Sequence, residues 1–324
     1  MINKDVIIVG AGPAGSTCAW KLKQYGADCL ILDKEEFPRL KLCAGWITPK
    51  VFSDLEIDAS DYPHSLMEFD RLYFHLFGLT IARKTRQYSI RRVEFDHWLV
   101  QRSGAPIEKH KVRNIRRENG LYIIDDQFAC RHLVGAGGTH CPVYQTFFKE
   151  INPRQENSLI ITLEEEFPYS FRDSRCHLWF FEHKLPGYSW YVPKGNGYLN
   201  VGIGGLFHEL KKNNDNLQHH WQRLITKLEQ RSLVTGHAFR PKGYVYYIRN
   251  NSVTPRIDNA FILGDAAGLA TTDMGEGIGP AIESGLLAAR AIALNEPYDL
   301  KAVHRTSNLM FPTLVRLVNI FRKN

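Results

Sequence analysis

The chain has 324 residues, of which 44% are hydrophobic and 23% are charged. This is the composition of a globular protein with a buried core, and it excludes collagen, coiled coils and extended disorder. The formal net charge is +7, but the cations are scattered and no zinc-finger or helix-turn-helix pattern is present, so we expect no nucleic-acid partner. No apolar run reaches the roughly 18 residues that span a bilayer, and we expect a soluble, cytoplasmic protein.

The cysteine and histidine patterns predict no metal site. None of the six cysteines belongs to a C-x-x-C pair, and the histidines show no H-E-x-x-H spacing. We expect most of the cysteines to be buried as small hydrophobic side chains. Cys43 is an exception because of the motif that contains it.

The N-terminal residues predict a strand, a glycine turn, a helix and a second strand. Residues 6–9 are a continuous run of Val and Ile, which is typical of a strand buried on both faces. A helix is expected after the turn and ends near Tyr25, where Gly26 follows. Residues 29–32 predict a second buried strand that ends at Asp33, and these elements form a βαβ start.

The following residues predict hairpins and one helix. Residues 71–83 have strand composition on both sides of Phe77-Gly78, which predicts a hairpin that turns there. Residues 94–102 predict a short helix. Residues 111–128 predict short strands around an Asn-Gly turn, and a buried strand follows at 132–135.

The second half of the chain is rich in strands and then becomes helical. Residues 158–205 predict strands, with a hairpin whose turn is Gly195-Asn196-Gly197. Residues 215–230 predict a polar helix with a buried apolar stripe. A strand at 260–263 leads into a glycine-rich segment, and residues 278–294 predict an alanine-rich helix.

The C-terminal tail from Asp299 is expected to be helical, with a kink at Pro312. Residues 311–323 alternate apolar side chains with Arg and Lys. Such a stretch could make peripheral contact with a membrane, or it could pack on the domain with its cations in water.

The α/β segments lie at both ends of the chain, and the β-rich segments lie between them. This order predicts a discontinuous nucleotide-binding domain into which a substrate domain is inserted. The expected nucleotide-binding domain comprises residues 1–65, 86–150 and 250–324, and the expected substrate domain comprises residues 66–85 and 151–249.

The first glycine-rich segment has the pattern of a dinucleotide-binding turn. Gly10, Gly12 and Gly15 follow a predicted strand and open a predicted helix. In this motif the first glycine permits the turn, the second lets a pyrophosphate approach, and the third permits close helix packing. Free N–H groups at the helix start favour phosphate, and the Asp33 carboxylate can accept both ribose hydroxyls. The same segments place Pro13, Ala14 and Lys34 at the expected cofactor.

A second glycine-rich segment near the C-terminus distinguishes a flavin site from a simple nicotinamide site. Asp265 follows a predicted strand and is placed to bind a hydroxylated linker such as ribityl. A helix then begins after Gly275, with N–H groups that could stabilise negative charge on a reduced flavin. The residues of this segment that we expect at the cofactor are Gly264, Asp265, Gly275, Gly277, Ile278 and Gly279.

With these two segments the chain resembles the p-hydroxybenzoate-hydroxylase-like superfamily of FAD enzymes, and within it the geranylgeranyl reductase family. The sequence GDAAGLATTDMGEGIGPAIESG at 264–285 resembles the superfamily's second motif. Arg92-Val93-Glu94-Phe95-Asp96 is similar to the family's R-x-x-F-D, whose arginine lies by the FAD. Leu42-Cys43-Ala44-Gly45 is similar to its cysteine-glycine segment near the flavin, and residues 187–195 are similar to its Y-x-W-x-F-P motif.

The resemblance implies an α/β fold in which an FAD-binding Rossmann-like domain carries an inserted β-rich substrate domain. It implies that Cys43 is a candidate proton donor or redox thiol. The positions that it implies at the cofactor are Cys43, Ala44 and Arg92, and those that it implies in the substrate cavity are Tyr188, Trp190 and Pro193.

The resemblance also implies an activity. Reduced FAD would deliver hydride to a C=C bond of an apolar, isoprenoid-like substrate, and a nearby acid would supply the proton. NAD(P)H or a reduced carrier protein such as ferredoxin is the expected electron donor, and Gly137, where the superfamily usually has Asp, leaves the choice open. Two alternatives are a monooxygenase or halogenase that uses O2, and an FAD-binding electron-transfer module.

Several of these side chains also have a plainer interpretation. Cys43 could simply pack under the flavin, and the two aromatic side chains of the Y-x-W motif could belong to the core of a sheet. Arg92 could form a surface ion pair with a neighbouring carboxylate. Arg39 and Lys41 are expected to be solvated charges in a loop.

Overall fold

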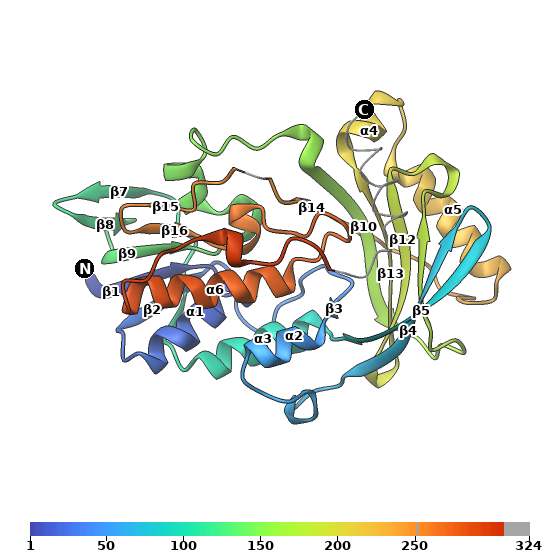
Figure 1. Ribbon diagram of the computed structural model, residues 1–324, viewed down its shortest axis with the longest axis horizontal. Coiled ribbons are helices and arrows are strands. Elements are labelled where there is room, and N and C mark those ends of the chain that lie inside the picture. Colours follow the sequence, from blue (N-terminus) through green and yellow to red (C-terminus); the bar gives the residue numbers. More distant parts are fainter. Residues whose placement is uncertain (251, 308–324) are drawn as a thin grey trace.

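The structure is a computed structural model, and it describes residues 1–250 and 252–307. Two sheets organise these residues, each with eight strands. Figure 1 shows the first sheet with its helices around the N-terminus and the second sheet beyond it. This arrangement confirms the predicted mixed α/β class with a β-rich second half, while the exact domain boundaries stay a prediction.

The first sheet is built around the N-terminal strand. Its main path runs β15-β16-β9-β1-β2-β6, and β1 pairs in parallel with both β2 and β9. Buried Val and Ile side chains fill the second half of β1, as expected of a central parallel strand. The strands are β1 (Ile2–Val9), β2 (Cys29–Asp33), β6 (Ile107–Lys109), β9 (Phe128–Gly135), β15 (Arg256–Ile257) and β16 (Ala260–Ile262), and the hairpin of β7 (Ile115–Glu118) and β8 (Leu121–Ile124) joins β9.

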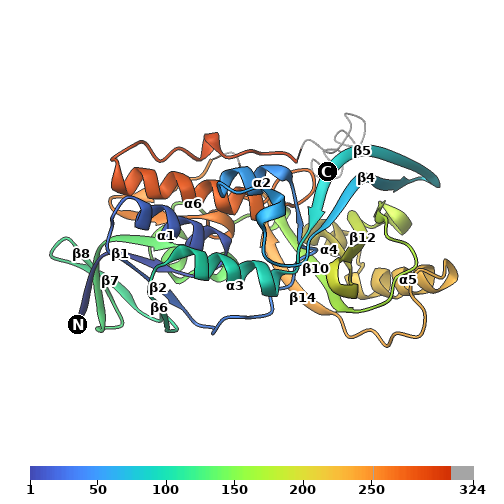
Figure 2. The same cartoon turned by 90° about the horizontal axis from the view of Figure 1, so that it is seen from below.

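Three helices lie side by side over one face of this sheet (Figure 2). They are α1 (Pro13–Gln24), α3 (Arg92–Ser103) and α6 (Ile278–Ala293), and the short α2 (Pro49–Asp54) contacts α6. Gly285 permits the close approach of α6 to α1, because a Cβ there would lie 2.6 Å from the carbonyl oxygen of Ala14.

The second sheet runs in the order β14-β10-β13-β12-β11-β4-β5-β3. All its neighbouring strands are antiparallel except β4 and β11, which are parallel. The strands are β3 (Trp46–Ile47), β4 (Met67–Leu76), β5 (Leu79–Ser89), β10 (Leu159–Pro168), β11 (Cys176–Phe180), β12 (Gly187–Lys194), β13 (Tyr198–Leu206) and β14 (Lys242–Tyr247).

Two helices follow β13, namely α4 (Phe207–Lys212) and α5 (Leu217–Gln230). The predicted apolar stripe of α5 is confirmed, because Trp221 and Leu228 are fully buried against Tyr191 and Val201 of the second sheet. This packing covers one face of the sheet and leaves the other face for the cavity described below.

The predicted hairpin turns are confirmed. Phe77-Gly78 joins β4 to β5, Asn119-Gly120 joins β7 to β8, and residues 195–197 join β12 to β13. In the first two turns both residues have positive φ angles, which suits the right-handed twist of the strands that they connect.

The expected helix from Asp299 is wrong for the residues that the structure describes. Only Leu300–Ala302 forms a 3-10 turn, and residues 303–307 are not helical. The side chain of Arg249 donates hydrogen bonds to the carbonyl oxygens of Leu300, Val303 and His304, and it occupies acceptors that a helix would need. The predicted kink at Pro312 and the stretch 311–323 lie outside the described residues.

Candidate active site

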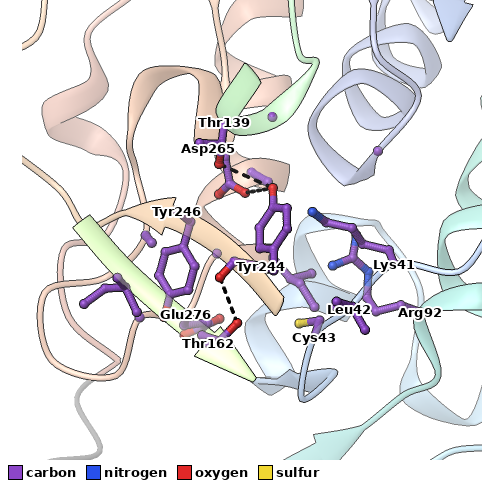
Figure 3. A pocket seen from close by; sticks show the side chains of 18 of the residues that line it. Lys41, Leu42, Cys43, Arg92, Thr139, Thr162, Tyr244, Tyr246, Asp265 and Glu276 are labelled. Atoms are coloured by element: carbon purple, nitrogen blue, oxygen red, sulfur yellow. Dashed lines mark hydrogen bonds between the residues drawn. The ribbon is translucent and has the colours of Figure 1, made fainter. Parts of the chain in front are cut away.

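One continuous cavity of about 970 Å³ is lined by residues of both sheets (Figure 3). This volume is at the upper end of the range for small-molecule sites in proteins. Glycine-rich segments line one end, aromatic side chains line the other, and charged side chains lie between them. The three regions are described in that order.

The three motif glycines at the start of α1 differ in how much space surrounds them. Gly10 has φ +109°, and Gly15 lies so close to Gly10 that a Cβ would be 1.9 Å from its carbonyl oxygen. By contrast, a Cβ at Gly12 would meet only the Arg39 guanidinium, at 3.6 Å. Gly12 is the N-cap of α1 and no side chain caps this end, so the first N–H groups of α1 remain available to an anion.

The second glycine segment forms a similar cradle at the start of α6. Gly275 has φ +66° and Gly277 is the N-cap, again without a side-chain cap. Glu276 lines the cavity, and its Oε1 is buried without a hydrogen-bond partner among the described residues. The uncapped start of α6 leaves its first N–H groups available to an anion.

The carboxylate of Asp33 ends β2 at the cavity. It accepts hydrogen bonds from the backbone N–H groups of Ala11 (2.7 Å) and Glu35 (2.9 Å), and these fix it beside the glycine turn. Together, the acid and the two uncapped helix starts fit a dinucleotide such as FAD.

The sequence allowed two interpretations of Arg92, a position beside the cofactor or an ion pair on the surface, and the structure agrees with part of each. Its guanidinium donates two hydrogen bonds to the carboxylate of Asp96, at 2.7 and 2.8 Å. This ion pair is buried rather than on the surface, and Arg92 also lines the cavity. The Arg39 guanidinium lies 3.4 Å from the same carboxylate, so two cations and one acid stand near the glycine end.

The expectation that Arg39 and Lys41 are solvated is wrong, because both are half-buried and line the cavity. The Lys41 Nζ atom lies 3.1 Å from the ring centroid of Tyr244, and Figure 3 shows both side chains at the cavity. Burial lowers the pKa of Lys41 to about 8, although the charge of Asp265 opposes the shift. A fraction of this amine is therefore neutral near physiological pH.

Cys43 lies in the cavity wall, half-buried, and the other five cysteines are buried. Its Sγ atom accepts a hydrogen bond from the backbone N–H of Gly45, at 3.3 Å. The fully buried ammonium of Lys194 donates hydrogen bonds to the carbonyl oxygens of Ala44 and Ile90 (2.7 Å to the latter). Lys194 of β12 therefore ties the segment that follows Cys43 to the second sheet.

The far end of the cavity is an aromatic wall. Tyr188 stacks on Phe180 with ring centroids 4.9 Å apart, and its hydroxyl donates a hydrogen bond to the carbonyl oxygen of Met274 (2.6 Å). Trp190 donates through Nε1 to the Asn200 side chain, at 2.7 Å. Pro193 does not line the cavity, and its carbonyl oxygen accepts a hydrogen bond from Ser89 instead.

Glu164 of β10 is the cavity residue that sequence reasoning missed. It is 3% exposed, and its Oε2 accepts a hydrogen bond from the Asn200 amide at 3.5 Å. Burial raises its pKa to about 7, although the charge of Lys194 opposes the shift. It also lines a second cavity of about 250 Å³, which shares Lys41 with the first. No local motif marks Glu164, because strand pairing alone brings it to Asn200.

The cavity brings together most of the residues that the sequence placed at a site. Those that do not line it are Gly15, Gly264, Gly279 and Pro193; those that do are Gly10, Gly12, Pro13, Ala14, Asp33, Lys34, Cys43, Ala44, Arg92, Tyr188, Trp190, Asp265, Gly275, Gly277 and Ile278. Contact of each with a cofactor or substrate stays a prediction. In the described part of the chain no cluster of His, Cys, Asp or Glu could hold a metal ion.

Comparisons with known proteins agree with this geometry. Residues 8–44 match the NAD(P)-binding Rossmann-like domain family. An uncharacterized protein of Methanosarcina barkeri is 33% identical over 306 residues, which cover 90% of this chain and 75% of the relative. A menaquinone reductase of Mycobacterium tuberculosis is 25% identical, covering 90% and 76% of the two chains.

Solved structures show the same fold. A geranylgeranyl bacteriochlorophyll reductase-like protein from Thermoplasma acidophilum superimposes with a TM-score of 0.79 at 20% identity, covering 100% of this chain and 84% of the other. This chain belongs to one family with the Methanosarcina barkeri protein and is a geranylgeranyl reductase-like, FAD-dependent oxidoreductase. The fold reaches beyond the family, since a flavin-dependent brominase superimposes with a TM-score of 0.71 at 18% identity, covering 98% and 84%.

The protein is therefore an FAD-dependent oxidoreductase. We call the glycine-lined end of its cavity the flavin end, because this is the end at which we expect the cofactor. None of the helices in the described part of the chain combines the length and apolar character that a bilayer crossing requires.

Proposed function

We propose that this protein reduces a C=C bond of an apolar, isoprenoid-type substrate. The observation that carries the proposal is the continuity of the cavity, in which an aromatic wall shares one space with the glycine cradles. An apolar chain loses water against such a wall, and burial of its surface provides the binding energy. The menaquinone reductase among the relatives supports the same chemistry.

FAD would lie along the two glycine cradles, and when bound it supplies the hydride. The N–H groups at the starts of α1 and α6 would hold its charged and polar parts, with Asp33 on the ribose side. Arg92 would add positive charge beside these groups while Asp96 keeps its side chain oriented. The aromatic wall would exclude water from the reacting carbon atoms.

Glu164 is the acid that we assign to proton transfer. A carboxyl whose pKa is raised to about 7 is partly protonated at neutral pH, which suits a general acid. Asn200 connects it with both Trp190 and the backbone carbonyl of Cys43. Glu164 also lines the second cavity. Water in that cavity would offer a route by which the carboxylate regains its proton. Cys43 is the competing donor, because it also lines the cavity.

The experiment starts from FAD-loaded protein under anaerobic conditions. After reduction with dithionite, a geranylgeranyl lipid is added in detergent, and flavin absorbance and product mass are followed. We expect the yellow colour to return as the product gains two hydrogen atoms per C=C bond. Stable reduced flavin and unchanged lipid would contradict the proposal and favour an electron-transfer module.

The electron donor is tested in the same apparatus. NADH and NADPH are titrated against the oxidised protein, followed by a reduced ferredoxin. We propose a carrier protein, because Gly137-Gly138 provides no carboxylate where the superfamily usually has one. Rapid bleaching by either nicotinamide would contradict this choice of donor and leave the proposed reduction of the substrate intact.

One observation favours a second candidate, a flavin enzyme that uses O2. Lys41 places a partly neutral amine inside the cavity, and flavin halogenases need a lysine there. Consumption of O2 coupled to a hydroxylated or halogenated product, lost in Lys41→Met, would establish this alternative in place of the reductase.

A further inference from the structure

The β4–β5 hairpin ends in an exposed apolar tip. In both views it reaches the end of the molecule opposite the N-terminus (Figures 1 and 2). Phe77 and Leu79 are 71% and 68% exposed, and Ile81 is 39% exposed. Away from the N-terminus, the other large hydrophobic side chains exposed in the described structure occur singly, as is normal for a protein surface. The tip is therefore an unusual concentration.

The backbone of the tip is suited to a different residue. Phe77 has φ +50° and Gly78 has φ +80°, which is the two-residue turn that favours Asn-Gly. A bulky residue at positive φ is an outlier, because its side chain crowds the backbone. Phe77 does not offset this cost by packing, since most of its surface is exposed. Packing within the described part of the chain therefore does not explain a large apolar side chain at this turn position.

Positively charged side chains lie along the hairpin behind its apolar tip. Residues 71–86 contain four Arg or Lys and no Asp or Glu. Arg83 and Lys84 lie four and five residues beyond Leu79, or about 13 to 17 Å along an extended strand. Near the base, Arg86 is paired with Glu68. A tip that enters the acyl boundary by roughly 5–10 Å would bring the two nearer cations toward the headgroups.

The apolar face of the hairpin continues into the cavity wall. Ile81 lies opposite Phe74 and Leu79 lies opposite Leu76, so these side chains share one face of the sheet. The Phe74 ring stacks on Phe180 at 5.8 Å, and Phe180 stacks on Tyr188, which lines the cavity. A continuous apolar path therefore joins the tip to the aromatic wall.

We propose that the tip of the β4–β5 hairpin docks into the surface of an anionic lipid bilayer. Docking would bring the aromatic wall close to the acyl chains, where an isoprenoid lipid dissolves. This second step rests on the proposed function, whereas docking itself does not.

Binding to vesicles tests the docking step. The FAD-loaded protein is sedimented with vesicles of phosphatidylcholine alone or with added phosphatidylglycerol. We expect it to bind the anionic vesicles at least tenfold more tightly, with binding that weakens as salt is raised. Phe77→Asn should weaken binding about tenfold or more, because it removes one large apolar anchor. The Asn-Gly sequence keeps the turn, so Phe77→Asn should not lower the melting temperature.

Two controls separate a specific tip from general stickiness. Ile151→Asn removes a side chain that is 49% exposed elsewhere, and it should leave vesicle binding unchanged. Lys84→Gln should weaken binding to anionic vesicles about fivefold and leave binding to neutral vesicles unchanged. The proposal would be overturned if the wild-type protein bound neither the neutral nor the anionic vesicles. It would also be overturned if Phe77→Asn bound the anionic vesicles as tightly as wild type does.

Other occupants of the tip give different results. If a second copy of the chain covers it, Phe77→Asn would change the size measured by gel filtration, and the bilayer proposal would fall. Failure of the proposed reductase function can be distinguished from failure of docking. In that case the wild-type protein would bind vesicles but leave an isoprenoid in detergent unreduced. If both proposals hold, Phe77→Asn should reduce the detergent-dispersed lipid normally and the vesicle-embedded lipid at least fivefold more slowly.

Discussion

The two ends of the cavity are built in different ways. At the flavin end the backbone forms the surface, through glycines at which a side chain would collide or would fill the cradle. At the substrate end the side chains form the surface, and they come from strands far apart in the sequence. Backbone cradles tolerate almost no substitution, whereas an aromatic wall can change residue by residue. The same difference allows related flavoproteins to keep one cofactor and vary the substrate.

The largest effect is expected at the backbone-built end. Gly12 has φ −71°, which any residue adopts, and a Cβ there meets only the flexible Arg39 side chain. Gly12→Val should therefore fold, yet it should lower FAD affinity at least hundredfold, because the side chain stands where the pyrophosphate must approach. Titration of the apoprotein with FAD, followed by flavin fluorescence, measures this loss.

Gly15 provides the matched control within the same turn. A Cβ at Gly15 would lie 1.9 Å from the Gly10 carbonyl oxygen, so Gly15→Ala should impair folding itself, as circular dichroism of the apoprotein would show. If Gly12→Val binds FAD as wild type does, the flavin does not lie along the first cradle.

This contrast also explains how much the sequence predicts. The glycine turn, Asp33 and the start of α6 are recognisable because backbone requirements restrict the residue type at fixed spacing. The roles of Glu164 and Lys194 cannot be recognised in the sequence, because the fold brings their hydrogen-bond partners from 36 and 104 residues away. Lys41 was misjudged for the same reason, since Tyr244 reaches it from a distant strand.

An intermediate effect is expected at Glu164, where the two ends meet. Glu164→Gln should slow reduction of the substrate by about a hundredfold, because an amide N–H is far too weak an acid to transfer a proton. Dithionite should still bleach the flavin at the wild-type rate. In wild type the rate should fall as pH rises through about 7, where the carboxyl loses its proton, and the variant should lack this fall.

The pH dependence of the free energy of unfolding is an independent test of the raised pKa of Glu164. The folded pKa of about 7 lies above the value of 4.5 for an exposed Glu, so the folded state holds a proton that the unfolded chain has released. The free energy of unfolding should therefore decrease between pH 4.5 and 7, by at most about 3 kcal/mol. Urea titrations of apoprotein should show this slope in wild type and lose it in Glu164→Gln.

Cys43→Ser decides between the two candidate acids. If Glu164 donates the proton, Cys43→Ser should change the rate less than about fivefold. A hundredfold loss in Cys43→Ser, together with a normal pH profile in Glu164→Gln, would transfer the role to the thiol.

The smallest effect is expected at Lys194, a buried residue of the second sheet that supports the segment after Cys43. Burial lowers the pKa of Lys194, yet its ammonium satisfies the carbonyl oxygens of Ala44 and Ile90. Lys194→Met would leave these acceptors without a donor and should lower the free energy of unfolding by about 2 kcal/mol. The exposed Lys184→Met should have no such effect.

The rate at which Cys43 is alkylated shows whether Lys194 also orders the segment around Cys43. Because Cys43 is half-buried and the other cysteines are buried, a thiol reagent added to the folded protein reports on Cys43. Lys194→Met should raise the alkylation rate several-fold by freeing the segment that follows Cys43, and FAD should slow it again. An unchanged rate in a destabilised variant would mean that Lys194 stabilises the sheet alone, and that each end of the cavity holds its shape without the other.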